Sequence, residues 1–148
     1  MTVPAKGVAQ YLLKKAASQD FGELLSNMKL QKLLYYCQGM YYAAYNKPLF
    51  NEKINAWQYG PVVPEIYHQL KTNGVSGIEP SFFPYFSEDL LSDEQKDIID
   101  DVFDYFGQFS AFKLMEMTHS EAPWMQTSIN DEIGQELMGN YFKQFLEK

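Results

Sequence analysis

The stretch that decides the fold runs from Lys29 to Lys71 and reads KLQKLLYYCQGMYYAAYNKPLFNEKINAWQYGPVVPEIYHQLK. Its first half continues a run that starts at Asn27 and ends at Tyr45, and this run is apolar or aromatic on almost every side. A helix of that composition is one that other elements surround, so we expect a buried central helix. Gly39 lowers the helix propensity in mid-run, which indicates a point where a neighbouring element approaches closely.

Shorter helical patterns flank this central run on both sides. We expect a first helix over Val3–Ser18 and the central helix over Asn27–Tyr45, which Ser26 or Asn27 caps. A third helix should run from Pro64 as far as Gly74, and a fourth from a capping box at Ser92–Gln95 to about Phe106. Two more are expected, one from Ser110 to Thr118 and one at the C-terminus with Asn130 as its cap. Residues 19–22 are expected to break the chain between the first two helices. Pro123 should interrupt the helical pattern, with Trp124 following as a buried anchor.

One segment, near residues 52–59, has no 3.6-residue period, and we interpret it as a short extended or β segment. Gly60-Pro61 after it is a turn signal. The loop from Gly74 to Asp89 carries several aromatic residues, which indicates a packed loop and not a linker between two domains. The sequence therefore predicts a single domain over residues 1–148, mainly all-α, an irregular bundle of about six helices around the buried central helix.

Charge and composition narrow the function classes. The net charge is −7 at pH 7, and all 12 basic residues are lysines. Arginine is the commonest specific reader of bases and phosphates, and an acidic surface repels the phosphate backbone, so we expect no direct nucleic-acid binding. A single cysteine, no long apolar run and no secretory leader favour a cytoplasmic protein without a membrane span. An acidic protein also suits a basic partner, although the same charge can serve solubility alone.

Several motifs in a fixed order carry a family resemblance. They are Lys29-Leu30-Gln31-Lys32-Leu33-Leu34-Tyr35-Tyr36, Gln38-Gly39, Lys47-Pro48-Leu49-Phe50, Ala56-Trp57-Gln58-Tyr59-Gly60-Pro61-Val62-Val63-Pro64, and Thr118-His119 with Ala122-Pro123-Trp124. In order and spacing they resemble the Panacea domain family, the phage-associated or GepA-like proteins that include SocA-like antitoxins and proteolytic adaptors. The resemblance implies a helical domain that acts as an antitoxin on a cognate toxin encoded beside it. It also implies an alternative, in which the protein delivers its partner to an ATP-dependent protease.

Candidate catalytic residues are few. Cys37 lies within the apolar helical pattern, which favours a core residue over a nucleophile. His119-Ser120-Glu121 places three catalytic residue types side by side, but adjacent residues rarely face one another, so we favour a capping or hydrogen-bonding role for His119. We expect no enzyme, no metal and no cofactor, because the two histidines lack ligand spacing and no phosphate-binding loop is present. A small enzyme using His119 and nearby carboxylates stays open as the alternative of another class.

The expected partner-binding surface is built around the segment that precedes the helix predicted to begin at Pro64. It comprises Trp57, Gln58, Tyr59, Gly60, Pro61 and Val62, together with His119 and Trp124 from the last motif. Aromatic side chains beside a rigid turn suit a binding hot spot, and an extended segment can also pair with a partner strand. The alternative is a structural role, in which Gly60-Pro61 only redirects the chain. An acidic row is expected to face solvent or, second, to dock a basic partner: Asp93, Asp97, Asp100, Asp101 and Asp104.

Overall fold

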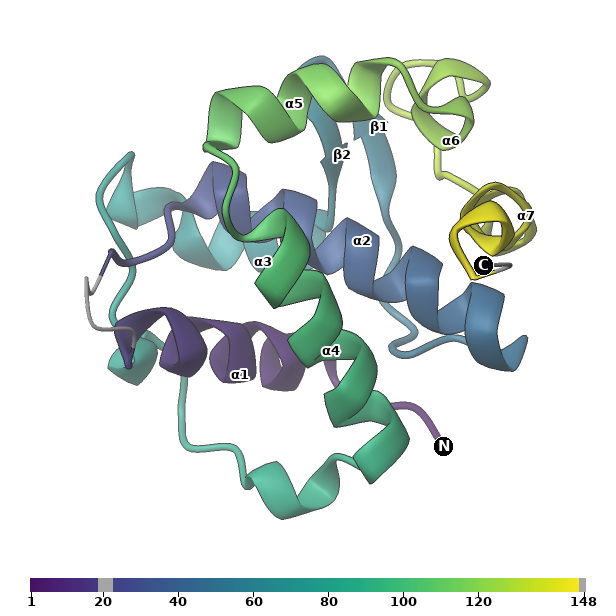
Figure 1. Cartoon of the computed structure of the whole chain (residues 1–148). Coiled ribbons are helices and arrows are strands. Elements are labelled where there is room, and N and C mark those ends of the chain that lie inside the picture. The colour runs from purple at the N-terminus through teal and green to yellow at the C-terminus, as the bar shows by residue number, and fades with distance from the viewer. Residues whose placement is uncertain (19–22, 147–148) are drawn as a thin grey trace.

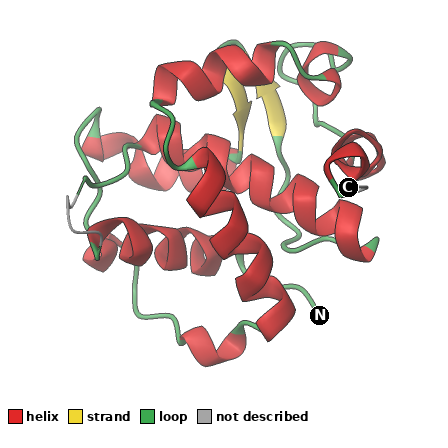
Figure 2. Ribbon diagram, in the orientation of Figure 1, coloured by secondary structure: helices red, strands yellow, loops and turns green. Residues whose placement is uncertain are grey.

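The computed structural model describes residues 1–18 and 23–146, and the chain break expected over residues 19–22 lies outside the described residues. The described residues form seven α-helices, one two-stranded antiparallel sheet and four short 3₁₀ turns. In chain order the helices and strands are α1 (Ala5–Ala17), α2 (Asn27–Tyr45), β1 (Asn55–Trp57), β2 (Gly60–Val62), α3 (Pro64–Leu70), α4 (Asp93–Phe106), α5 (Ala111–His119), α6 (Ala122–Met125) and α7 (Gln135–Phe142). The prediction of a mainly all-α fold with one short β segment is confirmed (Figure 1, Figure 2).

Helix α2 lies at the centre of the molecule, with α1, α3, α4, α5, α7 and β2 packed around it (Figure 1). Ser26 caps its first turn by accepting a hydrogen bond from the backbone N–H of Lys29, and Asn46 ends it in the left-handed conformation. A Cβ on Gly39 would collide with the ring of Phe142, so glycine lets α7 approach α2 closely. The buried core of α2 includes six fully buried residues: Leu30, Leu33, Leu34, Tyr35, Tyr36 and Cys37. The central helix and its close contact at Gly39 are therefore confirmed.

Of the three other predicted helix caps, those of α4 and α5 are confirmed and that of the last helix is not. Ser92 and Gln95 form a reciprocal capping box at the start of α4, and Ser110 caps α5. The prediction that Asn130 caps the terminal helix is wrong, because α7 starts only after Gly134. Asn130 takes a positive φ of 74° and donates its backbone N–H to the carbonyl of Ala56 in β1. A long-range strand contact, and not a helix start, therefore determines its conformation.

The predicted turn at Gly60-Pro61 is also wrong, because both residues lie in β2 and the turn is formed by Gln58 and Tyr59. Pro61 lies opposite Ala56 in the antiparallel register. The carbonyl of Ala56 points away from Pro61 and accepts a hydrogen bond from the N–H of Asn130 at 2.7 Å. The N–H that proline lacks is therefore not needed to satisfy this carbonyl, which explains why the strand tolerates a proline here.

Two predictions around α6 also need correction. Pro123 does not interrupt a helix but occupies the second position of α6, where its missing N–H is tolerated. Trp124 is half-buried and not a fully buried anchor. The loop after α3 is packed as expected in part, since Ile78 and Phe83 are buried while Tyr85 is 80% exposed.

Candidate functional site

The tip of the β1–β2 hairpin, formed by Gln58 and Tyr59, is held from outside by the end of α5 and by α6. The Nε2 atom of His119 lies 3.0 Å from the carbonyl oxygen of Gln58. Because a carbonyl can only accept, Nε2 carries the proton and donates it. The indole Nε1–H of Trp124 donates to the carbonyl oxygen of Trp57 over 2.8 Å. These two bonds fix the backbone of the hairpin tip from a segment about sixty residues further along the chain.

The predicted partner-binding residues divide into accessible and buried groups. Gln58 and Tyr59 are exposed, Tyr59 by 57%, and the ring of Trp57 is half-buried with its centroid 5.0 Å from that of Tyr67. The rings of His119 and Trp124 pack together with centroids 4.2 Å apart and are both half-buried. The structure therefore brings together Trp57, Gln58, Tyr59, His119 and Trp124. Three others are buried and support the hairpin from inside without offering surface: Gly60, Pro61 and Val62.

The two edges of this hairpin are packed against other parts of the chain. The outer edge of β1 is occupied by residues 130–133, since the N–H of Ile133 donates to the carbonyl of Ile54 and Asn55 bridges to Glu132. Strand β2 lies against α2 and α5, and all three of its residues are buried. Strand addition would therefore require residues 130–133 or the helices beside β2 to move, and the hairpin tip is the part that stays accessible.

A buried lysine that was not among the predicted site residues lies beneath the hairpin. Lys32 in α2 exposes 1% of its surface, and the ion pairs among the described residues involve Lys14 and Lys15 instead. Burial lowers the pKa of Lys32 to about 8. Gly60 has a φ of +108°, and a Cβ there would lie 2.6 Å from the Lys32 Cε atom. Glycine thus lets the hairpin backbone close over the lysine, and a lysine inside an otherwise apolar helix is the signal that could have found it.

A buried glutamate that was not among the predicted partner-binding residues, but only named beside His119, lies on another side of α2. Glu121, between α5 and α6, is 7% exposed, and its two carboxylate oxygens accept hydrogen bonds from the hydroxyls of Tyr35 at 2.9 Å and Tyr36 at 2.8 Å. Burial raises the pKa of Glu121 to about 7, although the two tyrosine hydrogen bonds oppose the shift. Two adjacent tyrosines in a buried helix both need a hydrogen-bond partner, which is the sequence signal for such an acceptor.

Glu121 also lines an apolar cavity of about 480 Å³ where α4, α5 and α7 meet over α2. The ring of Phe106 in this cavity stacks on Tyr36 with centroids 3.8 Å apart. The ring of Phe142 meets the edges of both tyrosines. The remaining lining comes from Met40, Ile98, Asp101, Val102, Tyr105, Met117, Phe145 and Leu146. A buried carboxylate thus lies at the edge of a mainly aromatic and aliphatic space.

His119 and Glu121 are separated by one residue yet have different partners. His119 bonds to the hairpin carbonyl, as its predicted hydrogen-bonding role requires, while Glu121 bonds to the two tyrosine hydroxyls. Cys37 is fully buried, and burial raises the pKa of its thiol, which is the opposite of what a nucleophile needs. The core prediction for Cys37 is confirmed.

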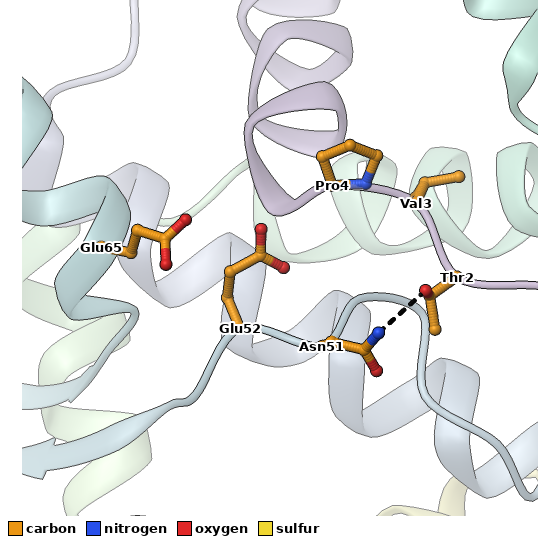
Figure 3. A pocket seen from close by; sticks show the side chains of 6 residues that line it. All are labelled: Thr2, Val3, Pro4, Asn51, Glu52 and Glu65. Carbon is orange, nitrogen blue, oxygen red and sulfur yellow. Dashed lines mark hydrogen bonds between the residues drawn. The ribbon is translucent and has the colours of Figure 1, made fainter.

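A second recess, of about 530 Å³, lies at the N-terminal end of α1 and is open and polar. Figure 3 shows the carboxylates of Glu52 and Glu65 in this recess and the hydrogen bond from Asn51 to the Thr2 hydroxyl, 3.1 Å long. The backbone N–H of Ala5, the first residue of α1, also donates to a carboxylate oxygen of Glu52 at 3.1 Å. Glu52 therefore supplies a cap for α1 from a remote loop, which gives this recess a structural role.

Comparisons with known proteins identify a family for this chain. The model of the family described as antitoxin SocA-like, Panacea domain, matches residues 30–125, which include Lys32, the hairpin and Glu121. Antitoxin SocA of Caulobacter vibrioides (strain NA1000 / CB15N) is 33% identical over 137 residues, covering 83% of this chain and 69% of that protein. No solved structure matches the chain. Within the described residues, no helix combines the length and apolar character needed to cross a membrane. The predicted resemblance is confirmed, and this chain belongs to the SocA-like antitoxin family with a Panacea domain.

Proposed function

We propose that this protein is an antitoxin that neutralises a cognate toxin by binding it directly. Membership of a family of SocA-like antitoxins supports this function, as does the 33% identity with antitoxin SocA over most of both chains. The net charge of −7 suits a basic toxin, because complementary charge speeds the encounter of two proteins. Binding then stabilises whichever inactive state of the toxin the antitoxin prefers.

The observation that carries the proposal is the hairpin tip. Tyr59 is exposed on a two-residue turn whose backbone is held by hydrogen bonds from His119 and Trp124. A tip that is already rigid loses little conformational entropy on binding, and exposed aromatic side chains are enriched among binding hot spots. We assign the partner contact to Gln58, Tyr59 and the accessible edges of Trp57, His119 and Trp124.

The test is co-expression with the product of the adjacent gene in the native locus. That product alone should arrest growth, and the wild-type antitoxin should restore it. Tyr59→Ala should weaken the complex by about 30-fold, the loss typical of a hot-spot residue, and should fail to restore growth. Tyr85→Ala is the matched control, because Tyr85 is 80% exposed on the loop between α3 and α4 and should leave the relief intact.

The same experiment separates neutralisation from delivery to an ATP-dependent protease. If the antitoxin only occupies the toxin, the toxin level stays constant in wild-type cells and in cells without the protease. If it acts as an adaptor, the toxin disappears when the protease is present and accumulates when the protease is deleted. A neighbouring protein that is harmless and forms no complex with this chain would contradict both versions.

A further inference from the structure

The apolar cavity beside Glu121 forms a second surface, separate from the hairpin tip. It measures about 480 Å³, within the range of about 300–1,000 Å³ that is usual for ligand-binding cavities. Its walls are the aromatic and aliphatic side chains of α4, α7 and the C-terminal 3₁₀ turn Lys143–Phe145, with Met40 of α2 and Met117 of α5. A well-formed space of this kind, next to a buried titratable group, has the composition of a binding site.

The rim of the cavity extends its apolar surface to the outside. Tyr105, Phe145 and Leu146 line the cavity and are 56%, 44% and 40% exposed. A small molecule inside the cavity would leave this rim uncovered, whereas a segment of a protein can fill the cavity and cover the rim together. Large exposed apolar side chains grouped around a concavity are typical of protein interaction sites.

Among the described residues that line the cavity, the charged groups all have one sign. They are two carboxylates, Glu121 between α5 and α6 and Asp101 on α4. Asp101 belongs to an exposed ridge of α4, at helical spacing, formed by Glu94, Asp97, Asp101 and Asp104. Within the part of the chain that the structure describes, the two ion pairs use Glu88 and Asp100 instead, so this ridge is not neutralised. A second copy of the same face would be repelled, and a basic segment would be attracted.

We propose that this cavity receives a basic amphipathic segment of the partner protein, whose apolar side chains enter the cavity while a lysine or arginine lies beside Glu121 and Asp101. The inference rests on the proposed function in one respect, namely that the partner is the toxin. Apolar anchors in a cavity with charged residues at its border form the usual anatomy of an interface between a helix and a groove. Of the acidic row predicted to face solvent or a basic partner, Asp97, Asp101 and Asp104 belong to this ridge, whereas Asp100 pairs with Lys15.

The test uses a synthetic peptide of about 14 residues made of leucine and lysine, with the leucines on one helical face. A matched peptide carries glutamate in place of every lysine. The full-length protein should bind the lysine peptide and not the glutamate peptide. Asp101→Lys and Tyr105→Ala change exposed rim positions, so the fold should be retained, and each should weaken binding by about tenfold or more.

Two exposed positions away from the cavity provide matched controls. Asp89→Lys repeats the charge reversal and Tyr85→Ala repeats the loss of a tyrosine ring, and both should change the affinity less than about twofold. Equal weakening by Asp101→Lys and Asp89→Lys would show diffuse charge attraction and would overturn the proposal. No binding of the lysine peptide, or equal binding of both peptides, would overturn it as well.

Growth relief by the same variants distinguishes this inference from the proposed function. If the wild type relieves toxin arrest while Asp101→Lys and Tyr105→Ala relieve it equally well, the antitoxin function stands and the cavity is not the contact. If the wild type gives no relief, the antitoxin function fails, and the peptide measurement still decides whether the cavity takes a basic amphipathic segment.

Discussion

An ionisable side chain is buried on the hairpin side of α2 and another on its cavity side, and the two are covered in different ways. On the hairpin side, the backbone of Gly60 closes over Lys32 and leaves a rigid exposed turn outside. On the cavity side, Glu121 is held by two tyrosines but still borders an apolar space. One helix thus supports two kinds of surface, a protruding tip held by backbone hydrogen bonds and a concave site with a carboxylate at its edge.

The motif residues of α2 make different contacts on these two sides. Gln31 and Gln38 bond to backbone, Gln31 to the N–H of Val63 at 2.8 Å and Gln38 to the carbonyl of Phe50 at 2.7 Å. They fasten the segment from Phe50 to Val63 onto α2, whereas Tyr35 and Tyr36 organise the cavity side. The motif on α2 therefore builds the platform, and the accessible surface comes from elements that pack on it.

The largest effect on the free energy of unfolding is expected for a residue that belongs both to the cavity wall and to the hydrophobic core. Phe142 is fully buried and its ring contacts the rings of Tyr35 and Tyr36, so Phe142→Ala should lower the free energy of unfolding by about 3–5 kcal/mol. Denaturant unfolding measures this loss. Tyr59→Ala at the hairpin tip should change it by less than about 0.5 kcal/mol, and similar losses at both positions would break the comparison.

Substitution of Lys32 should have the next largest effect on the free energy of unfolding. Its pKa is lowered from 10.5 to about 8 by burial, so the charged lysine destabilises the folded state, and Lys32→Met should raise the free energy of unfolding at pH 7 by about 3 kcal/mol. The wild type recovers stability as the pH rises from about 8 to 10.5, because the folded protein releases this proton first. The gain from Lys32→Met should therefore vanish in that window, and a gain independent of pH would contradict a charge effect.

Glu121 should show the opposite dependence on pH with a similar amplitude. Its pKa is raised from 4.5 to about 7, so its contribution to stability is complete below pH 4.5 and is lost as the pH rises through 7, by about 3 kcal/mol. In Glu121→Gln this part of the pH dependence should be missing. Unfolding curves of both proteins between pH 4.5 and 8 measure the difference, and parallel curves would exclude Glu121 as the titrating group.

The smallest effect concerns the hairpin tip. Trp124→Phe keeps an aromatic ring but removes the N–H that donates to the carbonyl of Trp57. The free energy of local opening of the hairpin tip should fall by about 1 kcal/mol. Amide hydrogen exchange at Gln58 and Tyr59 should accelerate while exchange in α4 stays unchanged. Acceleration throughout the molecule would indicate a general loss of stability and not a local role of this bond.

Much of the fold could be predicted from local sequence signals. The predicted caps Ser26 and Ser92 are confirmed, because a cap depends on residues next to it in the sequence. Asn130 and Gly60-Pro61 were misread because their conformations depend on strand pairing with β1, which no local pattern contains. Proline in a strand is tolerated only in a particular register, and register is a property of two segments.

The candidate site could be predicted only in part for the same reason. The motifs named the hairpin, His119 and Trp124, and the structure brings five of these residues together. Neither Lys32 nor Glu121 was predicted as part of the partner-binding site, because burial gives them their character, and Glu121 accepts hydrogen bonds from tyrosines 86 and 85 residues away. The cavity that Glu121 borders was also unpredictable, since it is formed by four helices, of which α2 lies far from the other three in the sequence.

Direct binding of a toxin is tested by calorimetric titration of the purified protein with the purified product of the adjacent gene. An antitoxin that binds through the hairpin tip should form a saturable complex, with equal affinity for the wild type and Tyr85→Ala and about 30-fold weaker binding by Tyr59→Ala. Absence of a complex with the wild type would show that the two proteins do not bind directly. Equal affinity of all three proteins would retain the antitoxin but remove the hairpin tip from its interface.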